Sequence, residues 1–242
     1  MPRRQRISTK GLIFHVLNRS ARRARLFDTA ADYESFEHVL SAALERSEVA
    51  LFAYCIMPNH WHFLLSPTAD GALSSFMHWL TTTHVRRWQI SRRLEGQGGV
   101  YQGRFKAFAV RSDHHFLRVC RYVERNALRA GLVERAEDWR WGSLWRGEDD
   151  RGRANTTEWP VARPSNWIDL VNAPQNEAEL EAIREAVRLS RPFGTDEWTQ
   201  AAIAQLGLPS GTSRRRRKSV MGSGVILEST SENDSRPHYR FR

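Results

Sequence analysis

Short apolar runs alternate with amphipathic segments over the first 111 residues, and their order restricts the fold. The apolar runs are residues 12–17, 51–57, 60–65 and 104–111. They are too short for stable helices and rich in branched and aromatic side chains, which favours buried strands. Helical spacing of apolar residues begins after Asp28, which we take as a cap, and continues to about Ser47. It recurs from a second capping residue, Asp70, to the glycine-rich loop at 96–99. The order strand, helix, strand, strand, helix, strand predicts an α+β fold, a ferredoxin-like split βαβ sandwich with an antiparallel sheet.

The rest of the chain adds segments outside this sandwich. Ser112 or Asp113 caps a further helix, and Gly131 marks its end. Residues 139–167 are irregular and rich in Trp, and helical patterns follow at 176–190 and 196–206, with start signals at Asn176 and Asp196. We expect three parts, listed here in chain order. They are a domain of residues 1–135, a Trp-rich and helical C-terminal extension of residues 136–209, and a basic, disordered tail of residues 210–242.

The charge balance indicates a polyanionic partner. Lys and Arg number 37 against 27 Asp and Glu, a formal net charge of +10, and nucleic acid is the first candidate. No apolar run approaches the roughly 18 residues of a membrane helix, and the N-terminus lacks the apolar stretch of a signal peptide, so we expect a cytoplasmic protein without a membrane partner. Cys55 and Cys120 lie in apolar segments, which favours core positions over a disulfide or a zinc site.

Two histidines follow the turn at Pro58 and Asn59. Side chains alternate between faces along a strand, so His60 and His62 share one face. Two neutral imidazoles side by side form half of a site for a divalent metal, which one or two oxygen ligands would complete. By itself the pattern is a weak signal, because two histidines at this spacing also occur by chance.

The helix after the fourth strand carries a second group of functional side chains. At about 100° per residue, one arc of roughly 100° contains Arg118, Tyr122, Arg125, Asn126 and Arg129. The opposite side is apolar, so the helix packs by one face and presents a basic stripe with a phenol and an amide one turn apart. The phenolate of Tyr122 could attack a phosphodiester while Asn126 offers an oxygen to the metal. The alternative is a solvated, arginine-rich helix with an ordinary surface tyrosine.

Several segments strongly resemble the REP-associated tyrosine transposases, which belong to the single-tyrosine HUH transposases of bacteria. They are MPNHWHFLL at 57–65, QGRFK at 102–106, RYVERNALRAGLV at 121–133 and RPFGTDEW at 191–198. The resemblance extends from about Gly11 to Leu208. Ala127 is a departure, since the family often has Pro there, but Ala is a good helix former and leaves the geometry of the helix intact.

The resemblance implies a ferredoxin-like HUH catalytic domain in residues 1–135, with the added helix as its catalytic helix. His60, His62 and Asn126 would hold Mg²⁺ or Mn²⁺, and Tyr122 would be the nucleophile of a single-strand DNA endonuclease and strand transferase with a covalent 5′-phosphotyrosine intermediate. The implied substrate is single-stranded DNA carrying the hairpins of repetitive extragenic palindromes. Oligomeric state stays open between monomer and homodimer, and so does whether the tyrosine serves its own subunit.

Basic residues outside the catalytic set are candidate DNA contacts. They are Arg19, Arg22, Arg23, Arg25, Arg104, Lys106, Arg118, Arg125 and Arg129, with Arg214, Arg215, Arg216 and Arg217 in the tail. His114 and His115, at a helix start, are candidates for phosphate contacts. The tryptophans of the extension could stack on unpaired bases, although a satellite core is the favoured interpretation. His84 is interpreted as a packed core residue, and His15 is ambiguous.

Two other classes of function compete with the transposase interpretation. One is a catalytically silent regulator that binds hairpin DNA with the same fold. The other is a metal phosphohydrolase that uses water and forms no covalent intermediate. The presence of His60, His62, Tyr122 and Asn126 together argues against a pure binding protein, which would not need all four.

Overall fold

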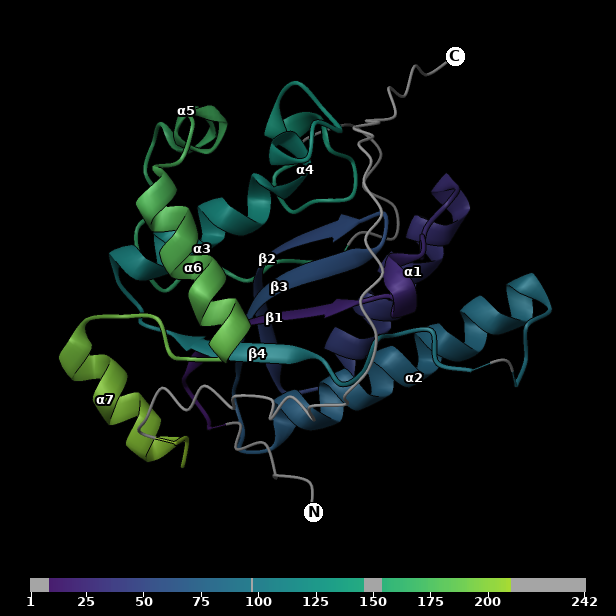
Figure 1. Cartoon of the computed structure of the whole chain (residues 1–242), viewed down its shortest axis with the longest axis horizontal. Coiled ribbons are helices and arrows are strands. Elements are labelled where there is room, and N and C mark those ends of the chain that lie inside the picture. The colour runs from purple at the N-terminus through teal and green to yellow at the C-terminus, as the bar shows by residue number, and fades with distance from the viewer. Residues whose placement is uncertain (1–8, 97, 146–153, 210–242) are drawn as a thin grey trace, which may run out of the picture. The chain divides into compact units, whose positions relative to one another are not determined.

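Four strands form one antiparallel sheet in the order β2-β3-β1-β4 (Figure 1). Their bounds are β1 Ile13–Arg19, β2 Val49–Met57, β3 His60–Pro67 and β4 Lys106–Val110. The structure is a computed structural model that describes residues 9–96, 98–145 and 154–209, all within one compact unit. The expected tail of residues 210–242, with Arg214 to Arg217, lies outside the described residues. Strand order and antiparallel pairing confirm the predicted ferredoxin-like α+β fold.

The register places β1 in the middle of the sheet, between β3 and β4. Leu17 pairs with His62 and Arg19 pairs with His60, so the strand continues to Arg19, two residues beyond the apolar run of residues 12–17. β2 and β3 form the predicted hairpin, with Met57 opposite His60 across the turn.

Helices α1 and α2 cover one face of the sheet. α1 spans Ala30–Glu45 and α2 spans Ala72–Arg92. The two predicted caps are wrong by one position each. Thr29, not Asp28, caps α1, because its hydroxyl accepts from the amide of Asp32 while the Asp32 carboxylate accepts from the amide of Thr29. Gly71, not Asp70, takes the N-cap position of α2, with a φ of 80° that favours glycine.

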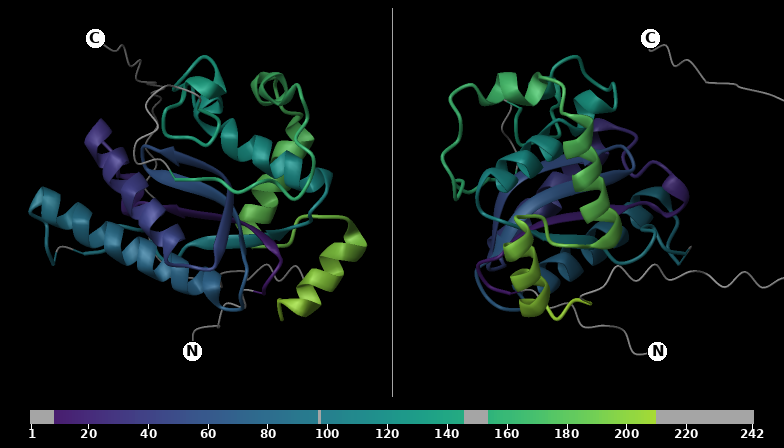
Figure 2. Two further views of the ribbon diagram at one scale, coloured as in Figure 1. Left: turned by 180° about the vertical axis from the view of Figure 1, so that it is seen from behind. Right: turned by 60° about the vertical axis from the view of Figure 1, so that its left-hand side comes forward.

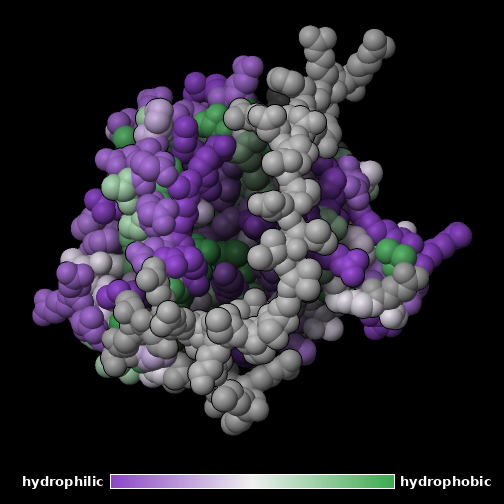
Figure 3. All heavy atoms as spheres, in the orientation of Figure 1, coloured by the Kyte–Doolittle hydropathy of each residue, from purple (hydrophilic) through white to green (hydrophobic). Residues whose placement is uncertain are grey.

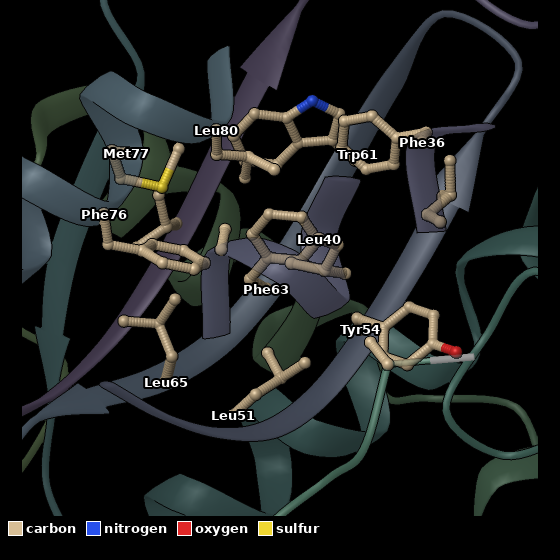
Figure 4. Packing of buried hydrophobic residues seen from close by; sticks show 14 of the residues in the cluster. Phe36, Leu40, Leu51, Tyr54, Trp61, Phe63, Leu65, Phe76, Met77 and Leu80 are labelled. Atoms are coloured by element: carbon tan, nitrogen blue, oxygen red, sulfur yellow. The ribbon is translucent and has the colours of Figure 1, made fainter. Parts of the chain in front are cut away.

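The core beneath these two helices is aromatic (Figure 4). Trp61 and Phe63 of β3 stack with ring centroids 4.4 Å apart, and Phe36 of α1 packs on both rings. Phe76 and Met77 of α2 close the layer. Since alternate β3 residues point into this core, His60 and His62 are directed to the opposite face, as the period-two pattern predicted.

The opposite face is covered by helix α3, which spans His114–Glu124, and by a short helix α4, which spans Asn126–Arg129. Asp113 is the N-cap of α3, and Gly131, with a φ of 68°, ends the segment, as predicted. The helical path breaks once at Arg125, so the predicted continuous helix is two helices. Buried apolar residues of α3 pack on Phe108 and Val110 of β4, forming a second core.

The extension contains the short 3-10 turn η2 (Ala136–Asp138) and the helices α5 (Trp167–Asn172), α6 (Glu177–Leu189) and α7 (Asp196–Gln205). The α5 and α6 helices of the extension pack on the same side as α3 (Figure 2), whereas Trp141, Trp198 and Leu206 pack on the core beneath α1 and α2. Another 3-10 turn, η1 (Ala21–Arg23), follows β1 near the start of the described residues. Helix α5 was not predicted, and the N-cap of α7 is Thr195 and not Asp196. In the view of Figure 3 the outer surface over α6 is mostly hydrophilic. No helix of the described residues is long and apolar enough to cross a membrane.

The tryptophans of the extension serve as core and anchors. The indole N–H groups of Trp139 and Trp159 donate to the carbonyls of Ile56 and Phe52, both on β2. Trp167 is buried beside Trp159, with ring centroids 5.0 Å apart. These contacts support the satellite-core interpretation over base stacking for the three side chains.

Candidate active site

His60 and His62 lie on the face of β3 that helix α3 covers. Their ring centroids are 5.0 Å apart. His60 Nδ1 is 2.7 Å from Asn59 Oδ1, and His62 Nδ1 is 2.9 Å from His15 Nε2. Neither Nε2 atom is hydrogen-bonded to any residue that the structure describes. Both rings therefore use Nδ1 for a protein partner and leave Nε2 for a ligand.

Burial keeps this pair neutral. Removal from water, reinforced by the charges of Arg19 and Arg129, lowers the pKa of His60 to about 4. Burial also brings the pKa of His62 well below its usual value, with neighbouring His60 and His15 adding to the effect. A neutral imidazole has the free electron pair that metal coordination requires, so the environment suits a ligand role at neutral pH.

His15 is a third histidine of this cluster, and the sequence left its role ambiguous. It lies on β1, is fully buried, and contacts Phe108 with ring centroids 4.9 Å apart. Burial lowers its pKa to about 3. Its Nδ1 is buried and has no hydrogen-bond partner in the structure. The contact of His15 with His62 could not be predicted from the sequence, because only the pairing of β1 with β3 brings the two residues together.

Tyr122 comes from the last turn of α3 and is 8% exposed. Its ring centroid lies 5.8 Å from that of His62 and 6.0 Å from that of His15, in both cases edge to face. The alternative of an ordinary surface tyrosine is wrong, since the side chain is buried against the histidine cluster.

Asn126 and Arg129 complete the surroundings of the tyrosine. The guanidinium carbon of Arg129 lies 4.2 Å from the centre of the Tyr122 ring, and Arg129 Nη2 donates to Asn126 Oδ1 at 2.8 Å. Asn126 Nδ2 and Arg129 Nη1 are buried and have no hydrogen-bond partner among the described residues. The amide oxygen expected to reach a metal is thus held by a guanidinium in this structure, with one electron pair left.

The predicted DNA contacts divide into two groups. Arg118 forms an ion pair with Glu179 of α6 at 3.3 Å, and Arg125 Nη1 donates to the carbonyls of Val171 and Asn172 at the end of α5. These two arginines therefore hold the extension, as does Arg121. Arg129, beside the Tyr122 ring, is partly buried. The other predicted contacts of the described part lie outside α3 and α4. Arg19 pairs with His60 at the end of β1, and the exposed ones are Arg22, Arg23, Arg25, Arg104 and Lys106.

A separate group of ligand-type side chains lies at the other end of α3. Atoms of Asp113, His114 and His115 lie within 4.8 Å of one another, close enough to share a metal ion. The Asp113 carboxylate is already engaged, because Oδ1 accepts from the amide and Nδ1 of His115 and Oδ2 pairs with Arg111 Nε at 3.1 Å. The positive charge of Arg111 beside this carboxylate disfavours binding of a metal ion there. We therefore prefer the histidine pair on β3 as the candidate metal site.

Residues 8–126 match the family of IS200-like transposases. This match assigns the matched part of the chain to that family of transposases. The matched part includes the histidine pair and Tyr122 and ends at Asn126. Within this transposase, the family therefore accounts for the sheet, α1, α2 and α3, whereas the extension lies beyond the match.

The chain is also similar to individual proteins and solved structures. The transposase is 26% identical, over 124 residues, to a Haemophilus influenzae protein assigned as a REP-associated tyrosine transposase, a match that covers 48% of this chain and 70% of that protein. Among solved structures, a REP-associated tyrosine transposase bound to a REP hairpin aligns with a TM-score of 0.49 and 20% identity, covering 65% of this chain and all of the other. A Deinococcus radiodurans protein assigned as a transposase aligns with a TM-score of 0.36 and 19% identity, covering 51% and 96%.

Proposed function

We propose that this transposase is a metal-dependent single-strand DNA endonuclease and strand transferase that acts on palindromic hairpin DNA through a covalent 5′-phosphotyrosine at Tyr122. The observation that carries the proposal is the position of the Tyr122 ring, 5.8 Å from that of His62 in the same chain, in a protein of the IS200-like family. A phenol buried beside two neutral imidazoles with free Nε2 atoms is suited to covalent phosphodiester chemistry.

The donor set fits a divalent cation. His60 and His62 would supply two imidazole nitrogens, and Asn126 an amide oxygen with a free electron pair. Mg²⁺ and Mn²⁺ are the proposed cofactors because the resemblance to the HUH transposases implies them, and the amide oxygen is a ligand type that both favour. When bound, the cation would polarise the scissile phosphate. The unpartnered Asn126 Nδ2 and Arg129 Nη1 are further polar atoms that a phosphate could engage at the same place.

Tyr122 then supplies the nucleophile. Its phenolic oxygen forms a bond to phosphorus, the bond from phosphorus to the 3′ oxygen breaks, and the departing 3′ oxygen takes up one proton for the one that the phenol loses. The guanidinium of Arg129 lies over the Tyr122 ring and stabilises negative charge on the phenolic oxygen during the attack. Attack by another 3′-hydroxyl on the phosphotyrosine reverses the step and joins strands, so no nucleotide hydrolysis is needed.

The DNA is expected to contact the arginines of the loop after β1 and the basic residues at the start of β4. Arg22, Arg23 and Arg25 are exposed in one loop, and Arg104 and Lys106 are exposed at the start of β4. The net charge of +10 favours binding to the phosphate backbone. A hairpin substrate is proposed because one related transposase is known bound to a REP hairpin.

The test is a cleavage assay with Mn²⁺ and a labelled single-stranded oligonucleotide that carries a short palindromic hairpin. We expect a protein-linked DNA fragment on a denaturing gel, and its loss in Tyr122→Phe and on addition of a chelator. The matched control is Tyr33→Phe, because Tyr33 is also buried but stacks on Trp141 beneath α1, away from the histidine pair. This control should form the adduct at the wild-type level.

Other outcomes distinguish the competing functions. An adduct that persists in Tyr122→Phe would refute the nucleophile assignment. Cleavage without an adduct would identify a phosphohydrolase that uses water. Tight, metal-independent binding of hairpins with no cleavage over a panel of substrates would identify a DNA-binding regulator.

A further inference from the structure

His60 and His62 each have a different hydrogen-bond partner at Nδ1, the ring nitrogen on the side away from Nε2. For His60 the partner is the Asn59 side chain, at 2.7 Å, and for His62 it is the His15 ring, at 2.9 Å. Neither partner is charged: one is an amide, and the other is a fully buried imidazole. The two contacts come from different elements, the β2–β3 turn and β1. Yet both end on Nδ1, the same atom of each ring.

The Asn59 amide has one fixed orientation. Its Nδ2 donates to the backbone carbonyl of Arg23 at 3.3 Å, and a carbonyl can only accept. Its Oδ1 is therefore the atom that faces His60, and an oxygen can only accept from Nδ1. A neutral His60 must then carry its proton on Nδ1, which leaves an electron pair on Nε2.

The His15–His62 pair can exist in two arrangements. Either His15 Nε2 donates to His62 Nδ1, or His62 Nδ1 donates to His15 Nε2. Only the second leaves an electron pair on His62 Nε2. Both arrangements keep the one hydrogen bond and leave the same buried atom, His15 Nδ1, without a partner. The pair can therefore change to the metal-binding arrangement without losing a hydrogen bond.

We propose that Asn59 and His15 are positioning residues: Asn59 selects the His60 tautomer with a free electron pair on Nε2, and His15 accepts from the same tautomer of His62, which metal binding then favours. The inference rests on the proposed function, because it assumes that these two Nε2 atoms hold the metal. It assigns to the two residues a role that neither the burial of His15 nor the turn position of Asn59 requires. Partners of this kind usually change metal affinity by about 10- to 100-fold when they are removed.

The first test is Mn²⁺ affinity of the full chain without DNA, measured by titration calorimetry. We expect Asn59→Leu and His15→Leu each to weaken binding by about 10- to 100-fold. Asn59→Asp and His15→Gln keep an oxygen that can accept from the imidazole N–H, and should stay within a few-fold of wild type. Unchanged affinity in both leucine variants would overturn the proposal.

A matched control separates positioning from general damage to the core. His84 is another buried histidine, 3% exposed, with its Nδ1 2.7 Å from the Tyr101 hydroxyl on the opposite side of the sheet. His84→Leu removes a buried imidazole and its hydrogen bond, but should leave Mn²⁺ affinity unchanged. Weakening of Mn²⁺ binding by His84→Leu equal to that by His15→Leu would attribute the effect to packing and overturn the proposal for His15.

A second measurement gives an answer even if the variant at the buried position, His15→Leu, does not fold. In protein with ¹⁵N-labelled histidine, long-range proton–nitrogen NMR spectra distinguish a proton on Nδ1 from one on Nε2. Metal-free wild type should show His60 with its proton on Nδ1, and Asn59→Leu should move that proton toward Nε2. A His60 proton on Nε2 in wild type would overturn the assignment for Asn59.

Failure of the proposed function gives a different result. If wild type does not bind Mn²⁺, or if His60→Ala binds it as well as wild type does, the metal site itself is wrong. If wild type binds Mn²⁺ and His60→Ala does not, while the leucine variants of Asn59 and His15 bind normally, only the positioning role is wrong.

Discussion

His84 makes a prediction about stability and pH that follows directly from its burial. Burial, reinforced by the charge of Arg92, lowers the pKa of His84 to about 3. The ring packs against Phe27 and Phe36, and its Nδ1 accepts from the Tyr101 hydroxyl, which keeps its proton because burial raises the pKa of that phenol. In the unfolded chain the same imidazole has a pKa near 6.5.

The direction of the effect follows from proton counts. Between these two pKa values the unfolded chain binds a proton that the folded chain does not, so the free energy of unfolding decreases as the pH falls below about 6.5. The loss continues until the folded pKa near 3 is reached. At about pH 5 the difference corresponds to about 1.5 pH units, and hence to about 2 kcal/mol from His84 alone.

The assay is urea denaturation of wild type and His84→Leu at about pH 8 and about pH 5. The variant should be less stable at about pH 8, because it loses the hydrogen bond to Tyr101, and wild type should lose about 2 kcal/mol more than the variant on acidification. His78→Gln, at an exposed position of the same helix, should keep the wild-type difference. An equal loss in wild type and His84→Leu would refute the reasoning, since the other buried histidines are common to both.

Two further predictions concern how the extension is attached. Gly194→Ala should destabilise the protein by about 1–3 kcal/mol in urea denaturation, because its Cβ would overlap the Trp198 ring, whereas Gly103→Ala, with open space around it, should be neutral. Glu124→Ala should cost about 3 kcal/mol and change tryptophan fluorescence, since the buried carboxylate accepts from Trp167 Nε1 at 2.6 Å, and Glu124→Gln should cost less because its amide oxygen can still accept.

The sheet and the faces of its strands could be predicted because they depend on local periodicity. Alternation along β3 was enough to place His60 and His62 opposite Trp61 and Phe63. Helix starts were less accurate. Asp28, Thr29 and Asp32 all lie within one turn, and any side-chain oxygen among them could have capped α1, so only the reciprocal hydrogen bonds of Thr29 and Asp32 decide the matter.

The environment of the tyrosine helix could not be predicted in the same way. Its periodicity correctly separates Tyr122 and the arginines from the apolar residues of α3, but it does not say what covers the basic stripe. Arg125 donates to carbonyls 46 and 47 residues further along the chain, on a helix that the sequence did not indicate. Positive charge on this helix therefore predicted DNA contacts where the structure has attachments of the extension.

The extension also bears on how two copies of the chain could associate. At the β2 edge of the sheet, Ile56 N donates to the carbonyl of Trp141 at 2.8 Å, and Ser143 N donates to that of Tyr54 at 2.9 Å. At the β4 edge, Phe193 N donates to the carbonyl of Ala109 at 2.8 Å. Residues of the extension thus occupy backbone groups on both outer strands, and edge-to-edge pairing of two sheets would have to displace them. The contacts of the described residues therefore disfavour a dimer built by pairing the outer strands of two sheets.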